Sequence, residues 1–91
     1  MLSQIPIDFN KDAKDVDKQV CRVGMIAELD AVSLYEQLAA ETKSSRIRNM
    51  LLDIAKEEKT HMGEFQALLL EIDKEQEKEL VQGKKEVKEK A

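Results

Sequence analysis

Residues 47–72 of the chain read IRNMLLDIAKEEKTHMGEFQALLLEI, and this stretch decides the fold. Apolar side chains recur in it at steps of three and four residues, proline is absent, and the only glycine is Gly63. That spacing is typical of an α-helix that buries one face. We therefore predict a helix over residues 45–75. Its apolar positions are Ile47, Met50, Leu51, Ile54, Ala55, Met62, Phe65, Leu68, Leu69 and Ile72.

An earlier stretch of the chain shows the same spacing. We predict a helix over residues 11–42, because no proline and only one glycine interrupt it. The turn between the two helices falls at residues 42–45, TKSS, where Ser44 or Ser45 can cap the second helix. The apolar positions of the earlier helix are Val20, Cys21, Met25, Val32, Tyr35, Leu38 and Ala39.

The two ends of the chain have a different character. We expect residues 1–10 to be an irregular lead-in, because Pro6 blocks helix propagation, and Asp8 or Asn10 can cap the helix that follows. Residues 76–90 are predicted to form a short C-terminal helix or tail, which can break at Gly83. Residues 1–91 are treated as a single domain, since a chain of this length supports no more than one.

Composition narrows the class of protein. Apolar residues make up 42% of the chain and charged residues 37%, which suits long amphipathic helices, whereas 3% aromatic residues are too few for a β-sandwich core. A net charge of −4 argues against nucleic-acid binding, which needs a basic surface. No apolar run reaches the roughly 18 residues of a membrane span, and the N-terminal residues lack a signal-peptide pattern. The single cysteine can form no internal disulfide.

Two such helices form an antiparallel hairpin that leaves apolar surface exposed. A chain of this size buries only about 60–65% of the surface that its unfolded form exposes, so a lone copy is marginally stable. A second copy of the hairpin would complete a four-helix bundle. The sequence thus predicts an all-α fold, in which a two-helix antiparallel hairpin with a short C-terminal helix dimerises.

Three polar side chains lie on the predicted buried faces. Glu58 and His61 interrupt the apolar stripe of the second helix, and Glu28 interrupts that of the first. Counted from the turn, all three lie at a similar height, about 22–26 Å away at a rise of about 1.5 Å per residue. Because an unpaired buried carboxylate is costly, these side chains need a partner.

A pair of metal ions would be such a partner. One hairpin offers two carboxylates and one imidazole, so two hairpins related by a two-fold axis offer four carboxylates and two imidazoles. This is the ligand set of ferritin-like di-iron and di-manganese proteins, in which two divalent ions balance the four negative charges. Oxygen-rich ligation favours iron, or manganese, over structural zinc. We predict that Glu28, Glu58 and His61 of both copies bind two metal ions per dimer.

The same residues have other interpretations. A Glu-x-x-His spacing arises often by chance on a Glu-rich helix. His61 can be a core histidine paired with Glu58, and Glu28 can lie at the helix edge. Glu57, four residues before His61, is a competing partner. Tyr35 lies one heptad after Glu28, where it either packs in the core with its hydroxyl bonded to a carboxylate or takes part in redox chemistry.

Two segments carry a family resemblance: AELDAVSLYEQ at residues 27–37 and LLDIAKEEKTHMGEFQALLLEID at residues 51–73. They resemble the encapsulated ferritins, in particular the ferritin-like domain joined to the shell protein in archaeal encapsulins. The resemblance implies ferritin-like four-helix-bundle dimers that close into a decameric ring. It also implies a ferroxidase centre at the dimer interface, with Glu28, Glu58 and His61 as ligands and Tyr35 beside them.

The resemblance further implies an activity and a location. Such proteins oxidise Fe(II) with dioxygen and pass Fe(III) to a surrounding encapsulin nanocompartment in the cytoplasm. The chain departs from the family in two places. The acids that flank the first ligand in some members, where incoming metal binds, are Ala27 and Asp30 here, so only Asp30 could serve. Residues 83–91, GKKEVKEKA, do not look like a shell-docking peptide, so either the domain is cut from a longer fusion or the chain reaches its shell in another way.

A ferroxidase acting on Fe(II) and dioxygen is therefore the predicted function, with two alternatives. A rubrerythrin-like peroxide-scavenging domain needs an electron donor, and the chain has no Cys-x-x-Cys element to supply one. A non-catalytic helical oligomer would use its polar core residues to fix the register of the helices.

Overall fold

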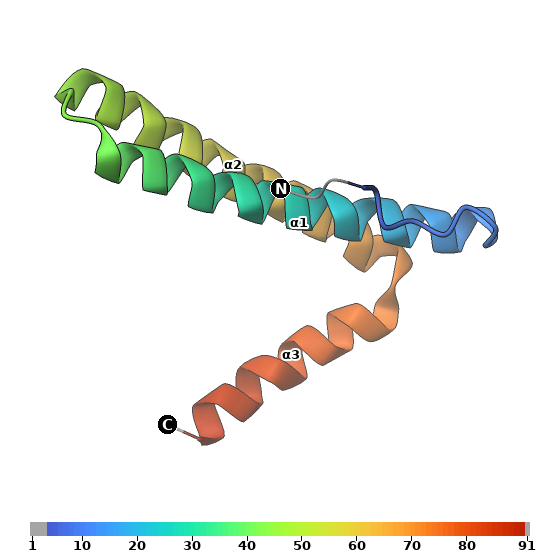
Figure 1. The fold of residues 1–91 in the computed structure, drawn as a ribbon. Helices are drawn as coiled ribbons and strands as arrows, with labels where there is room; N and C mark the ends of the chain where they lie inside the picture. The colour runs from blue at the N-terminus through green and yellow to red at the C-terminus, as the bar shows by residue number, and fades with distance from the viewer. Residues whose placement is uncertain (1–3, 91) are drawn as a thin grey trace.

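The structure, a computed structural model, describes residues 4–90. Three helices make up the fold, α1 (Ala13–Glu41), α2 (Ser45–Ile72) and α3 (Lys74–Glu89), and the described residues contain no strand. α1 and α2 lie antiparallel as a long hairpin, whereas α3 points away from it (Figure 1). The predicted all-α class is confirmed. Residues 1–3 of the predicted lead-in lie outside the described part of the chain.

The turn between α1 and α2 is built from local polar contacts. Ser44 is the N-cap of α2, as predicted, because its hydroxyl accepts a hydrogen bond from the backbone N–H of Ile47 at 3.2 Å. α1 has no basic residue in its last turn, and Arg48 of α2 supplies the missing positive charge. Its guanidinium donates to the carbonyl oxygens of Ala39 at 3.2 Å and Thr42 at 2.6 Å. These contacts fix the point at which the chain reverses.

The beginning of α1 differs from the prediction. The helix starts two residues after the predicted residue 11 and ends one residue before residue 42. Its N-cap is Asp12 rather than Asp8 or Asn10, because the Asp12 carboxylate accepts a hydrogen bond from the N–H of Asp15 at 2.9 Å. The backbone of Asp8 instead exchanges two hydrogen bonds with the side chain of Gln19, at 2.6 and 3.2 Å. This pair of bonds lays the lead-in back along α1 (Figure 1).

The junction of α2 and α3 also corrects the prediction. α2 ends at Ile72, three residues before the predicted residue 75, because Asp73 caps a new helix. The Asp73 carboxylate accepts one hydrogen bond from the N–H of Gln76 and another from the guanidinium of Arg22, both at 3.0 Å. α3 then runs without a break through Gly83. A single carboxylate therefore both starts α3 and ties the junction to α1.

The hairpin buries few apolar side chains. Those buried within the described residues are Cys21, Val32, Ala39, Ala55 and Leu69, of which Leu69 is 1% exposed. Burial, together with the nearby Asp17 carboxylate, raises the pKa of the Cys21 thiol. Cys21 thus behaves as a small buried apolar side chain. None of the helices within residues 4–90 combines the length and apolar character of a membrane-crossing segment.

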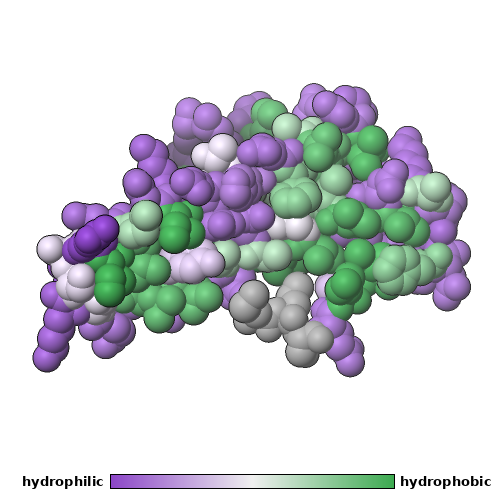
Figure 2. Space-filling view, turned by 90° about the horizontal axis from the view of Figure 1, so that it is seen from above, coloured by the Kyte–Doolittle hydropathy of each residue, from purple (hydrophilic) through white to green (hydrophobic). Residues whose placement is uncertain are grey.

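Many large apolar side chains are exposed instead. Figure 2 shows hydrophobic groups gathered in patches on the face viewed there. The exposed large apolar residues of the described chain are Ile5, Phe9, Val20, Ile26, Leu29, Leu34, Leu38, Ile47, Met50, Leu52, Leu68, Leu80, Val81 and Val87. Large exposed apolar patches are typical of surfaces that contact another molecule.

Candidate metal centre

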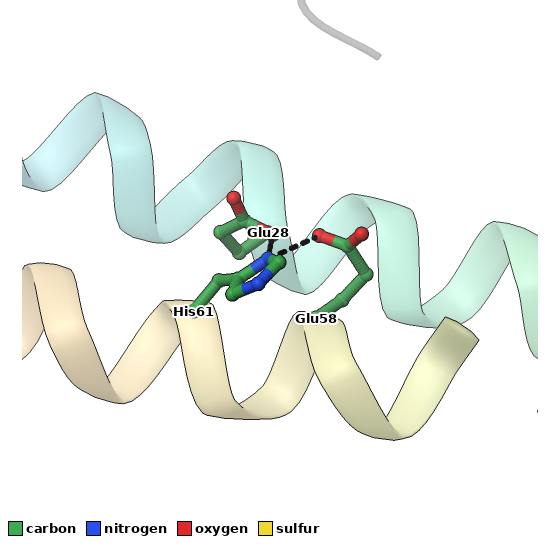
Figure 3. A group of neighbouring side chains, drawn as sticks. All are labelled: Glu28, Glu58 and His61. Atoms are coloured by element: carbon green, nitrogen blue, oxygen red, sulfur yellow. Dashed lines mark ion pairs between the residues drawn. The ribbon is translucent and has the colours of Figure 1, made fainter. Parts of the chain in front are cut away.

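The three side chains singled out in the sequence meet between α1 and α2. One possible ligand atom from each of Glu28, Glu58 and His61 lies within 4.8 Å of the others. Figure 3 shows Glu28 on α1, opposite Glu58 and His61 on α2, with all three turned toward one another. The convergence predicted from their matching heights is confirmed. Their role as metal ligands stays a prediction.

The distances within this group are too long for good hydrogen bonds. His61 Nδ1 lies 3.6 Å from Oε2 of Glu28 and 3.5 Å from Oε2 of Glu58. An N–H···O hydrogen bond is usually about 2.7–3.2 Å long. Atoms that share one metal ion at bond lengths of about 2.0–2.2 Å lie about 3 Å apart at right angles and about 4.2 Å apart on opposite sides. The spacing therefore suits a shared ion after only small side-chain movements.

Burial distinguishes the two carboxylates from the imidazole. The side chains of Glu28 and Glu58 are 18% and 19% exposed, whereas that of His61 is 46% exposed. Oε2 of Glu28 is fully buried, and it has no hydrogen-bond partner in the described part of the chain. Leaving a buried acceptor without a hydrogen bond is costly, so the arrangement calls for an explanation. A cation held between the three side chains would satisfy this oxygen.

The donor set limits which ion would fit. Two carboxylates and one imidazole are donors that suit iron and manganese, and no thiolate is present in the group. Cys21, the only cysteine of the chain, lies two turns before Glu28 on α1 and outside the group. The residues of the group thus fit a carboxylate-rich site rather than a structural zinc site.

The other residues discussed from the sequence lie outside this group. Tyr35 is half-buried on α1, two turns and about 10 Å of helix beyond Glu28. Glu57 is exposed, as expected for a residue off the core face, and Asp30 is half-buried on α1. The redox role of Tyr35 and the metal-attracting role of Asp30 stay predictions.

Sequence reasoning did not single out Gly24, one turn before Glu28. The structure places it against the ring of Phe65 on α2, one turn after His61. The sequence feature that could have identified it is a glycine in the middle of a long helix, one turn from the height of the three polar residues.

Comparison with known proteins gives three findings. The rubrerythrin family model matches residues 19–91. A ferritin-like-encapsulin shell fusion protein from Pyrococcus furiosus is 49% identical over 92 residues, which cover 98% of this chain and 27% of that protein. The crystal structure of the encapsulated ferritin domain from Pyrococcus furiosus matches with a TM-score of 0.85 and 48% identity, over 98% of this chain and 94% of that one.

The two relatives differ in how much of them the chain spans. It covers about a quarter of the fusion protein but nearly all of the encapsulated ferritin domain. The family typically binds a di-iron centre, and the carboxylate–histidine group lies within the segment that the family model matches. The chain belongs to the rubrerythrin family, and within it to the encapsulated ferritin-like domains.

Proposed function

We propose that this protein is a ferroxidase, which oxidises Fe(II) to Fe(III) with dioxygen at a di-iron site shared by two copies of the chain. The observation that carries the proposal is the group of Glu28, Glu58 and His61, in which one buried oxygen of Glu28 lacks a hydrogen-bond partner within residues 4–90. A purely structural polar cluster would satisfy that oxygen within the protein. Membership of a family whose di-iron proteins are typically oxidoreductases supports the same function.

One protomer supplies half of the ligands for such a site. Its two carboxylates and one imidazole are half of the four carboxylates and two imidazoles found in ferritin-like di-iron centres. A two-fold pair of protomers would bring four negative charges together, which two divalent ions would neutralise. Without the ions these carboxylates would repel one another, so metal binding and pairing should be coupled.

The surroundings of His61 support pairing across this face. Met50 and Leu68 are 62% and 51% exposed, and the His61 side chain is 46% exposed. Their spacings of 11 and 7 residues place the three side chains within about 20° of one another around α2. A second copy packed on this stripe would bury the apolar side chains and bring its own ligands to the first set. We propose this homodimer as the functional unit, and the decameric ring as its further assembly.

Fe(II) is the substrate of the proposed reaction, and the chain holds it and tunes its potential. Carboxylates are hard donors that stabilise Fe(III) more than Fe(II), so they favour loss of an electron. Two Fe(II) ions supply two electrons, and water supplies two protons, which convert one dioxygen to hydrogen peroxide. The same donors accept manganese, which is the alternative metal.

An aerobic oxidation assay tests the activity. Fe(II) is added to the purified protein, and the rise of Fe(III) absorbance is compared among wild type, Glu28→Ala, His61→Ala and Glu57→Ala. Glu57 is the matched control, because it is an exposed acid next to Glu58 that lies outside the group. The first two variants should fall to the rate of Fe(II) in buffer, while Glu57→Ala keeps the wild-type rate. Equal rates in all four proteins would contradict the proposal.

Peroxide scavenging is a second candidate, favoured by the match to the rubrerythrin family model. It uses the same residues but a different oxidant. If it were the function, the Fe(II)-loaded protein would be oxidised far faster by hydrogen peroxide than by dioxygen. We expect the opposite order of rates, with hydrogen peroxide appearing as a product. A non-catalytic oligomer would show neither reaction.

We also propose that the protein acts inside an encapsulin shell. The Pyrococcus furiosus relative is a ferritin-like domain fused to an encapsulin shell protein, and the chain matches the encapsulated domain over 94% of its length. Expression of the full-length gene together with its shell protein should give iron-loaded shells by electron microscopy. Shells that stay free of iron, beside an active ferroxidase outside them, would contradict this location.

A further inference from the structure

Gly24 and Phe65 are in unusually close contact across the hairpin. A Cβ atom built on Gly24 would lie 2.6 Å from Cδ1, 2.7 Å from Cε1 and 2.8 Å from Cγ of the Phe65 ring. Real Cβ atoms essentially never come within 3.0 Å of such neighbours. The ring therefore occupies the space that any other residue at position 24 would fill. The two helices can approach this closely only because residue 24 lacks a side chain.

The other two glycines show that this is a local property. A Cβ on Gly63 or Gly83 would meet nothing within 4 Å in the described chain. Neither of them is required by packing within one protomer. Gly24 alone among the three is needed for the approach of α1 to α2.

This contact lies next to the candidate metal centre. Gly24 is one turn before Glu28 on α1, and Phe65 is one turn after His61 on α2. We propose that Gly24 and Phe65 are a positioning pair, which sets the separation of α1 and α2 so that Glu28 can share a metal ion with Glu58 and His61. The inference rests on the proposed function, because it assigns the pair a role in building that site.

The three ligands depend unequally on this separation. Glu58 and His61 are three residues apart on α2, so their mutual distance follows from the helix itself. Glu28 is the only member on α1, and its 3.6 Å separation from His61 spans the gap between the helices. A displacement of α2 by about 1 Å would leave the first pair intact and change only the distances to Glu28, which would weaken its hold on a shared ion.

The Phe65 ring cannot relieve a clash by rotating in place. Its Cγ atom lies on the axis about which the ring turns, and that atom itself is 2.8 Å from the position of the added Cβ. Relief therefore requires either that the side chain swings out about its first torsion angle or that α2 shifts. Either movement changes the packing one turn from His61.

Co(II) binding tests the pair without relying on iron oxidation. Co(II) is titrated into wild type, Gly24→Ala and the matched control Gly83→Ala, following its visible absorption spectrum. Gly24→Ala should bind Co(II) about 10- to 100-fold more weakly, the usual cost of losing the support of a ligand, and should show an altered spectrum. Gly83→Ala should match wild type in affinity and spectrum, although it makes the same chemical change within a helix.

A rescue variant separates positioning from general damage. Phe65→Ala in the Gly24→Ala background removes the ring, including Cγ, so the added methyl group has room. We expect this double variant to recover Co(II) affinity to within about threefold of wild type, together with the wild-type spectrum. If Gly24→Ala does not fold, a double variant that folds and binds Co(II) still supports the pair.

Each failure has a distinct meaning. A wild-type protein that binds no Co(II) would overturn the metal site and this inference together. Equal Co(II) binding by wild type and Gly24→Ala would overturn the positioning pair alone and leave the proposed site intact. The same conclusion follows if the double variant is no better than Gly24→Ala.

Discussion

Glu28 and Asp73 are two largely buried carboxylates with opposite surroundings. Both oxygens of Asp73 accept a hydrogen bond within the protein, one from the N–H of Gln76 and one from Arg22. Oε2 of Glu28 is buried, yet it has no hydrogen-bond partner among the described residues. The Asp73 side chain is 11% exposed, and the Glu28 side chain is 18% exposed. Burial alone therefore does not separate the two; the completeness of their hydrogen bonds does.

The difference separates a carboxylate that stabilises the fold from one that is available to a ligand. The hydrogen bond from the Gln76 backbone, and then Arg22, hold the pKa of Asp73 below its usual range against the opposing effect of burial. Asp73 is thus kept as a carboxylate by its own protein. Glu28 lacks such a set of donors, and we infer that a metal ion takes their place. The following predictions test this contrast.

Glu28→Gln should have the largest effect of these substitutions, and the property that it changes should be metal binding. The amide keeps the shape of the side chain but removes a negative charge and one oxygen donor, so Co(II) affinity should fall by more than about 100-fold. The metal-free variant should unfold at nearly the wild-type temperature, because within the described residues Oε2 makes no hydrogen bond and only a long 3.6 Å contact with His61 Nδ1. Circular dichroism melts with and without Co(II) measure both effects. A variant that unfolds more easily without metal would make Glu28 a structural residue.

Asp73→Ala should have the opposite effect: it should lower stability and leave metal binding unchanged. The substitution removes the N-cap of α3 and leaves Arg22 without its partner, so the unfolding midpoint should fall. Asp73→Asn should lose less stability, because an asparagine oxygen still caps the helix while the charge pairing with Arg22 is lost. Co(II) affinity should stay within about threefold of wild type in both variants, since neither touches the metal group. Loss of Co(II) binding in Asp73→Asn would contradict the division of the two carboxylates into one that stabilises the fold and one that binds metal.

The pH dependence of stability should report on Asp73. Its pKa is lower in the folded chain than in the unfolded one, so the unfolded chain binds more protons as the pH falls. The stabilisation is fully present above the ordinary aspartate pKa of about 3.9 and is lost as the pH falls through the lowered value. Metal-free wild type should therefore lose stability more steeply below about pH 4 than Asp73→Asn. If the free energy of unfolding, measured with urea, changed equally with pH in wild type and Asp73→Asn, this assignment would be contradicted.

The smallest effect is expected at an exposed carboxylate. Glu36 pairs with Lys59 at 3.7 Å across the hairpin, and both side chains are at least half exposed. Because exposed ion pairs contribute little, Lys59→Ala should change the free energy of unfolding by less than about 0.5 kcal/mol. Co(II) affinity should not change. A larger loss of stability in a urea titration would show that solvent exposure does not predict how much these carboxylates contribute to stability.

The metal group was predictable from the sequence because helices are regular. The rise per residue fixes the height of Glu28, Glu58 and His61 relative to the turn, and the turn itself was marked by Ser44. Their convergence to within 4.8 Å follows from these local rules. The predicted second helix runs past the break at Asp73, although an aspartate followed three residues later by Gln76 is a recognisable N-cap pattern. A continuous helical periodicity obscured it.

Other features depend on distances that no local rule supplies. The contact between Gly24 and Phe65 requires the separation of the two helix axes, which depends on every side chain packed between them. The hydrogen bonds that hold Asp8 against Gln19 depend on how an irregular segment folds back. The contact of Arg22 with Asp73, which links α1 to the start of α3, joins residues that are 51 positions apart in the chain. Long-range contacts of this kind are set by the whole fold.

The central claim is that two copies of the chain complete one metal centre. Analytical ultracentrifugation without oxygen, over a series of Fe(II) and protein concentrations, tests it most directly. Fe(II) should move the chain from monomer toward dimer or larger even-numbered assemblies, with one Fe(II) bound per chain, and Glu28→Gln should abolish the shift. Monomers that bind one Fe(II) each with undiminished affinity on dilution would contradict the claim.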